Sequence, residues 1–288
     1  MELVKTIKHA RAALTMLSAD EVKKRAERPV YAGLIADSSS AYSELEGFLV
    51  PDELPPALRR LRMSQISRAS DPNVPAEVDV ILCEPGLHCP EGAFSFDRDH
   101  PENTIKEIVA QKDDIALALG RQFPAFRKPV IDGIVHEIAK ENALFALATA
   151  LPNVVPNFIE LPWIFGEFAS DTVFLTANQA RMAFQIAAVC GQKVGFAKQK
   201  GELFTIAAGA FGWRALAREL VSHIPLGGGL IPKGAIAYAG TYSVGKALEF
   251  YHYTSRQMTP EERKKLYQQG LDRGRSFAES LPASESRA

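Results

Sequence analysis

The chain has 288 residues, 47% hydrophobic and 23% charged, a composition typical of a folded protein with a sizeable core or two domains. Its 33 basic and 34 acidic side chains leave a formal net charge of −1, which excludes a global basic field, and we expect no nucleic-acid partner. The three cysteines include no CxxC pair, which predicts neither a disulfide framework nor a thiolate zinc site and fits a reducing compartment. Charges interrupt the apolar runs of residues 1–9, so we expect no secretory signal.

Residues 1–28 are expected to form N-terminal helices. Apolar residues recur there at helical spacing, and 18–21 has the pattern of a capping box for a second short helix that Pro29 ends. Residues 29–100 then predict a small α/β unit: a strand at 30–36, a helix at 42–50 and a second strand at 78–83, followed by a polar loop. The chain from 101 onward reads as helical, so the expected fold class is α+β.

The segment between the first strand and its helix has the length of a phosphate-binding loop but not its chemistry. Such a loop uses two glycines to wrap phosphate with backbone N–H groups and a lysine to neutralise charge. Ala36, Ala41 and Tyr42 occupy those three places. We therefore expect no catalytic residue and no cofactor, and a protein that is not an enzyme. The side chains that could still bind a nucleotide are the hydroxyls of Ser38, Ser39, Ser40 and Ser43. The alternative is that these serines serve in a turn or as a helix N-cap.

Two patterns resemble metal sites and fall short of them. His136 and Glu137 begin an H-E-x-x-H zinc helix, but Lys140 stands where the second imidazole is needed. Cys83, His88 and Cys89 lie close together in the sequence, although their spacing matches no tetrahedral pattern. We predict no metal site.

Residues 101–280 are expected to form a helical, hydrophobic domain, and 281–288 a disordered tail. The expected helices cover 104–119, 130–151, 170–190, 203–220, 231–250 and a charged helix after Thr259, with 123–129 as a linker. The apolar stretches at 143–165 and 224–250 are broken by proline, glycine and charges, which favours shallow membrane association over spanning helices. Small residues recur every four positions within 235–245, a spacing that lets helices approach closely.

The residues that we expect to contact a membrane or a partner come from these stretches. Aromatic side chains suit either a membrane interface or a core, and small residues suit a close helix contact. The candidates are Trp163, Phe165, Phe168, Trp213, Arg214, Lys233, Gly240 and Gly245.

Eight ordered segments resemble a bacterial helical family of unknown function, related to the YcjF inner-membrane protein and also found behind Era-like GTPase domains. They are 123–129, 141–147, 151–156, 176–180, 213–220, 224–225, 231–233 and 237–242. The resemblance covers about residues 120–280 and implies a membrane-associated helical domain without an established activity.

The amino-terminal part resembles a GTPase half-domain more loosely. Residues 83–86, Cys-Glu-Pro-Gly, resemble the D-x-P-G motif of GTPases, but Cys83 replaces the aspartate of that motif. The sequence contains no N-K-x-D motif.

These features lead to one hypothesis and two alternatives. The hypothesis is a non-enzymatic adaptor or GTPase-associated module on the cytoplasmic face of the inner membrane, bound peripherally or by shallow insertion. Its partners would be inner-membrane lipid, a membrane protein or a GTPase. The first alternative is a residual nucleotide-binding, GTPase-like protein. The second is a soluble, cytoplasmic helical bundle that forms homo-oligomers through residues 235–245.

Overall fold

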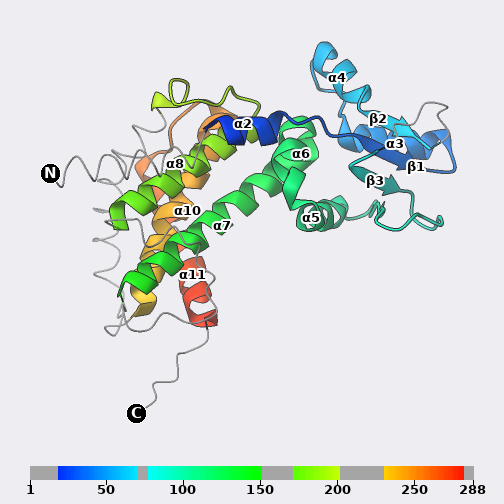
Figure 1. The fold of residues 1–288 in the computed structure, drawn as a ribbon. Coiled ribbons are helices and arrows are strands. Elements are labelled where there is room, and N and C mark those ends of the chain that lie inside the picture. Colours follow the sequence, from blue (N-terminus) through cyan, green and yellow to red (C-terminus); the bar gives the residue numbers. More distant parts are fainter. Residues whose placement is uncertain (1–18, 70–76, 151–170, 202–229, 282–288) are drawn as a thin grey trace. The chain divides into compact units, whose positions relative to one another are not determined.

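The computed structural model describes residues 19–69, 77–150, 171–201 and 230–281. The chain divides into two compact units. The sheet unit comprises Val22–Asp132 and Ala187–Lys193, and the helical unit comprises Met1–Glu21, Gly133–Ile186 and Val194–Ala288. A small parallel sheet and long helices make this an α+β fold with a mainly helical body, as the sequence predicts (Figure 1).

The sheet has four parallel strands in the order β2-β1-β3-β4. They are β1 (Ala32–Ile35), β2 (Ile66–Arg68), β3 (Val80–Cys83) and β4 (Phe94–Ser95). Ala32 of β1 pairs with Ile66 on one side and Val80 on the other, which makes β1 and β3 the central strands. The predictions of strands at 30–36 and 78–83 are therefore confirmed.

The helices of this part of the chain are short. They are α2 (Ala19–Glu27), α3 (Ser39–Leu49), α4 (Pro56–Met63), α5 (Pro101–Gln111), the 3-10 turn η1 (Asp113–Ile115) and α6 (Ala116–Gln122). The predicted helix at 42–50 begins earlier, at Ser39, because Ser38 caps it. The single helix predicted at 104–119 is wrong, because the backbone leaves the helical conformation at Lys112 and separates α5 from α6. The first predicted helix, within 1–18, and Ser18 of the capping box lie outside the described residues.

Four long helices follow: α7 (Pro124–Ala150), α8 (Asp171–Val189), α10 (Leu230–Thr254) and α11 (Pro260–Ser280). They match the predictions at 130–151, 170–190, 231–250 and after Thr259. The linker predicted at 123–129 is wrong. Pro124 takes the first helical position, where its missing N–H costs nothing, and Pro129 lies inside the helix. The predicted helix at 203–220 and the predicted disordered tail, from residue 282 onward, lie outside the described residues.

Helices α10 and α11 pack closely because small residues face each other. A Cβ atom added to Gly274 of α11 would lie 2.8 Å from the carbonyl oxygen of Ala235, and one added to Gly270 would lie 2.9 Å from the Cα of Ala239. Helix α11 starts with a capping box between Thr259 and Glu262. Among the described residues, no helix combines the length and the apolar character needed to cross a bilayer.

Candidate functional site

The carboxyl ends of β1 and β3 form the place where an open parallel sheet usually binds its ligand. Strand β2 lies beyond β1 and strand β4 lies beyond β3, so the chain reverses its direction of winding between the two central strands. The backbone after β1 leads directly into α3, whose first residue is Ser39. The sequence-predicted serines therefore stand at this switch point, which is where a nucleotide would bind.

The hydroxyl groups at this switch point make local contacts. The Ser38 side chain accepts a hydrogen bond from the backbone N–H of Ala41 at 3.1 Å, as an N-cap does. The Ser43 hydroxyl donates to the carbonyl oxygen of Ser39 at 2.9 Å, within the first turns of α3. Ser39 and Ser40 are exposed in the first helical turn. The N-cap role that the sequence offers as an alternative is confirmed for Ser38.

Carboxylates also occupy this edge of the sheet. Glu84, directly after β3, accepts a hydrogen bond from the backbone N–H of Asp37 at 2.9 Å. Arg98 Nε pairs with Glu44 of α3 at 2.7 Å, and its Nη2 lies 3.9 Å from Glu84. A phosphate at this helix terminus would meet two negative side chains with one arginine between them. The local charge thus disfavours a triphosphate.

The loop after β3 differs from the expectation for the cysteines. Cys83 and Cys89 form a disulfide, with their Cα atoms 6.3 Å apart. The expectation of no disulfide is wrong here because the turn between them, which includes Gly86 at φ 89°, brings the two side chains together. Within the part of the chain that the structure describes, no group of three or more His, Cys, Asp or Glu side chains is arranged to hold a metal ion.

A buried polar cluster joins three helices of the helical unit. Asn142 of α7 donates to Thr241 of α10 at 2.8 Å, and Asn178 of α8 donates to Asn142 at 2.9 Å. Asn178 also donates to Glu141, which pairs with Arg181. Burial raises the pKa of Glu141, and the charge and hydrogen bond of Arg181 oppose that effect. These amides satisfy one another across the helices, so we interpret the cluster as structural.

His136 of the incomplete zinc pattern has a different partner. Its Nδ1 atom forms a hydrogen bond with the hydroxyl of Tyr238 on α10. Burial lowers the pKa of His136, and the charges of Lys140 and Arg273 lower it further. Burial likewise raises the pKa of Tyr238 to about 12. The pair links α7 and α10, and the partial burial of His136 favours a neutral imidazole.

The predicted contact residues have different surroundings. Lys233 is exposed and Gly240 has open space around it. Gly245 is buried between helices, and an added Cβ there would lie 2.6 Å from Val135 Cγ2 of α7 and 2.8 Å from Met182 Sδ of α8. The others lie outside the described residues: Trp163, Phe165, Phe168, Trp213 and Arg214.

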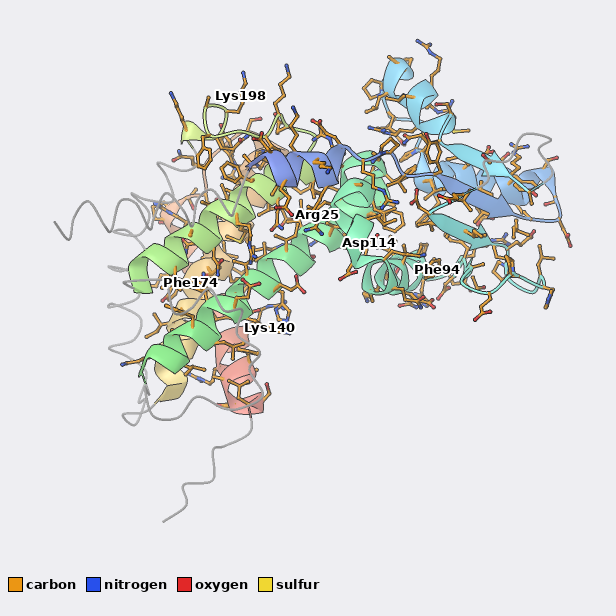
Figure 2. The ribbon with its side chains drawn as sticks, viewed as in Figure 1. Arg25, Phe94, Asp114, Lys140, Phe174 and Lys198 are labelled. Atoms are coloured by element: carbon orange, nitrogen blue, oxygen red, sulfur yellow. A yellow bond between two sulfur atoms is a disulfide. The ribbon has the colours of Figure 1, made fainter. Side chains whose placement is uncertain are left out.

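One end of the helical unit brings together the helix termini that adjoin both apolar stretches. The ring of Phe174 near the start of α8, labelled in Figure 2, stacks on Phe145 near the end of α7 with centroids 4.1 Å apart. Near the start of α10, a Cβ on Gly234 would lie 3.0 Å from Leu147 of α7. Ala150, Asp171 and Leu230 therefore end or begin their helices at the same end of the unit. We call it the apolar end.

Comparison of the chain with family models, curated proteins and solved structures finds no match. The resemblance to the YcjF-like family therefore stays a prediction.

Proposed function

We propose that this protein is a non-enzymatic, membrane-associated adaptor that binds the lipid surface of the cytoplasmic face of the inner membrane through its apolar end. The observation that carries the proposal is the meeting of three helix termini, at Ala150, Asp171 and Leu230, next to the two apolar stretches of the sequence. Apolar segments that leave one end of a helical unit can act together on one surface.

The residues around these termini suit a shallow contact. The segment after α7 carries Trp163, Phe165 and Phe168, and aromatic side chains favour the level of the lipid headgroups. The same segment contains Glu160 and three prolines, and charges at bilayer depth are costly. Lys233, exposed in the first turns of α10, can reach anionic headgroups while its stem lies along apolar surface. These properties favour interfacial binding.

The switch point of the sheet gives no comparable support to nucleotide hydrolysis. Ser38 caps α3, and Glu84 accepts the hydrogen bond of the Asp37 backbone N–H, so these groups already have partners within the protein. An adaptor needs no reactive group, and it gains its role by holding a partner at the membrane. The resemblance to a family found beside GTPase domains makes a GTPase a candidate for that partner.

Cell fractionation and co-sedimentation with protein-free anionic vesicles test the proposal. We expect the wild-type chain in the membrane pool and on the vesicles. The double variant Trp163→Asp, Phe168→Asp should move to the soluble pool, because it puts two charges into the apolar stretch. The double variant Tyr251→Asp, Tyr253→Asp is the matched control, since it puts the same two charges at exposed aromatic positions near the other end of α10.

Circular dichroism of each variant verifies that the helices remain folded. Full recovery of the wild-type chain in the soluble pool without detergent would overturn the proposal. Binding to native membranes but not to protein-free vesicles would replace lipid by a membrane protein as the primary partner.

A further inference from the structure

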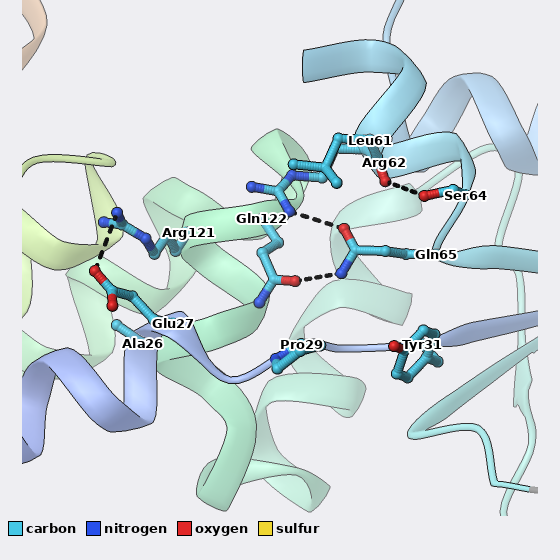
Figure 3. Close-up of a pocket in the computed structure, with 10 residues that line it drawn as sticks. All are labelled: Ala26, Glu27, Pro29, Tyr31, Leu61, Arg62, Ser64, Gln65, Arg121 and Gln122. Carbon is cyan, nitrogen blue, oxygen red and sulfur yellow. Dashed lines mark hydrogen bonds and ion pairs between the residues drawn. The ribbon is translucent and has the colours of Figure 1, made fainter. Parts of the chain in front are cut away.

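A pocket of about 340 Å³ lies within the sheet unit, between the end of α2, the turn from α4 to β2, and α6 (Figure 3). Its walls combine apolar and cationic side chains. Tyr31 and Leu61 line it and are 39% and 54% exposed, so both offer apolar surface to a molecule in the pocket. Arg62 and Arg121 contribute the two guanidinium groups.

Within the described part of the chain, no carboxylate acts as a counterion for Arg62. Its Nη1 atom donates to Gln65 Oε1 at 2.8 Å, and its Nε atom is buried with no hydrogen-bond partner among the described residues. Burial lowers the pKa of Arg62, and the neighbouring charge of Arg121 lowers it further. A partly buried cation without a counterion is costly, so an anion that enters the pocket would be stabilised.

Arg121 is already engaged and does not compete for that anion. Its Nη1 atom donates to the carbonyl oxygens of Ala188 and Gln192 at 2.7 and 3.0 Å, and Glu27 lies 3.9 Å from its Nη2 atom. The nearby carboxylate of Glu27 therefore balances Arg121. The positive charge that remains in the pocket belongs to Arg62.

Two buried glutamines hold Arg62 in place. Gln65 Nε2 donates to Gln122 Oε1 at 2.6 Å and to the carbonyl oxygen of Val30 at 3.2 Å, which leaves Gln65 Oε1 facing Arg62 (Figure 3). Gln122 Nε2 in turn donates to the carbonyl oxygen of Arg28 at 2.6 Å. This chain of hydrogen bonds orients the guanidinium before any ligand arrives, which reduces the entropy lost on binding.

We propose that this pocket binds a small soluble organic anion, whose phosphate or carboxylate group pairs with Arg62 while its apolar body lies against Tyr31 and Leu61. Guanidinium groups bind both oxyanions through two parallel hydrogen bonds. Arg68 of the same chain does so with Glu46, through Nε at 2.7 Å and Nη2 at 3.0 Å. The exposed ring of Tyr31 offers a surface for a planar or aliphatic body.

Titration calorimetry on the full chain at constant ionic strength tests the proposal with inorganic phosphate, phenyl phosphate and benzoate. We expect saturable binding of at least one aromatic anion, weakened about tenfold or more in Arg62→Gln because a bidentate charged pair is lost. Arg60→Gln is the matched control, since Arg60 is exposed on the same helix and does not line the pocket. The phenyl phosphate and benzoate arms distinguish the two anionic groups.

Thermal unfolding keeps the test independent of folding defects. The ligand should raise the Tm of the wild type and of Arg60→Gln but not of Arg62→Gln. Leu61→Ser should weaken the aromatic ligand more than inorganic phosphate. No saturable binding of either aromatic anion, or equal binding by Arg62→Gln and the wild type, would overturn the proposal. The membrane proposal is unaffected by either result, because no lipid is present in this experiment.

Discussion

Gly240 and Gly245 lie on the same helix, α10, and meet different surroundings. An added Cβ has open space at Gly240 but lies 2.6 Å from Val135 Cγ2 at Gly245. Alanine in place of glycine within a helix gains about 1 kcal/mol, whereas overpacking a core costs about 1–3 kcal/mol. We therefore expect Gly240→Ala to stabilise the protein and Gly245→Ala to destabilise it. Urea unfolding of the two variants measures both signs, and stabilisation by Gly245→Ala would contradict the packing around it.

His136 makes the stability of the helical unit depend on pH. The pKa of His136 lies below its ordinary value of 6.5 in the folded chain, first because of burial. The unfolded chain then binds more protons than the folded chain as the pH falls below 6.5, so the free energy of unfolding decreases on acidification. We expect His136→Gln to lose less stability than the wild type between neutral and mildly acidic pH.

Comparing how the free energy of unfolding changes with pH in the wild type and in His136→Gln separates the effect of His136 from that of Glu141. Burial raises the pKa of Glu141 above 4.5, so its contribution to the free energy of unfolding decreases as the pH rises through that range. That contribution has the opposite sign and is common to both proteins. Equal slopes of the unfolding free energy against pH would show that His136 is not held neutral in the folded chain.

Helix α11 depends on two glycines for its contact with α10. At Gly274 the obstacle to a Cβ is backbone, the carbonyl oxygen of Ala235 at 2.8 Å, which no change of rotamer can move away. Gly274→Ala should therefore displace α11 and lower the free energy of unfolding by about 1–3 kcal/mol. Hydrogen exchange should become faster along Pro260–Ser280.

Glu279→Ala is the control for this helix, because Glu279 is exposed near its end. Unchanged exchange in Gly274→Ala would mean that the two helices do not need their close approach. The same result would leave the small residues of α11 without a packing role.

The long periodic helices and the two central strands could be predicted from the sequence, and the two edge strands could not. The capping box at Thr259 and the apolar spacing of α8 and α10 are local signals. Strand β2 has three residues and β4 has two, so their strand character depends on pairing with β1 and β3. The break at Lys112 and the helical course of Pro124–Ala150 through Pro129 likewise depend on surroundings that no local pattern contains.

The site at the first strand could be predicted from a local sequence pattern, whereas the pocket could not. The place of Ser38 after the first strand could be predicted, because a loop between strand and helix is a local pattern. The pocket brings together Tyr31, Gln65 and Gln122, which are far apart in the sequence and belong to no motif. The one feature of the sequence that indicates the pocket is the group of arginines around Leu61 on α4. Such a group also fits a solvated helix face.

At the scale of the whole molecule, the proposed function requires that one end of the helical unit faces lipid. Lys233 lies close to that end and Tyr251 lies near the opposite end of α10. Their positions differ by 18 residues, which corresponds to about 27 Å along a helix and is close to the thickness of a bilayer's hydrocarbon core, about 30 Å. A label at each position therefore reports a different distance from the membrane.

We expect a fluorescent label on Lys233→Cys to be quenched by brominated lipids and a label on Tyr251→Cys to be unaffected. Both variants are made in a Cys190→Ser background without reductant, so that Cys83 and Cys89 stay paired and do not react. Both original side chains are exposed, so the substitutions disturb the packing little. Equal quenching of the two labels would mean that α10 lies parallel to the membrane surface, which would contradict contact through the apolar end. Quenching at Tyr251→Cys alone would assign the membrane contact to the opposite end of α10.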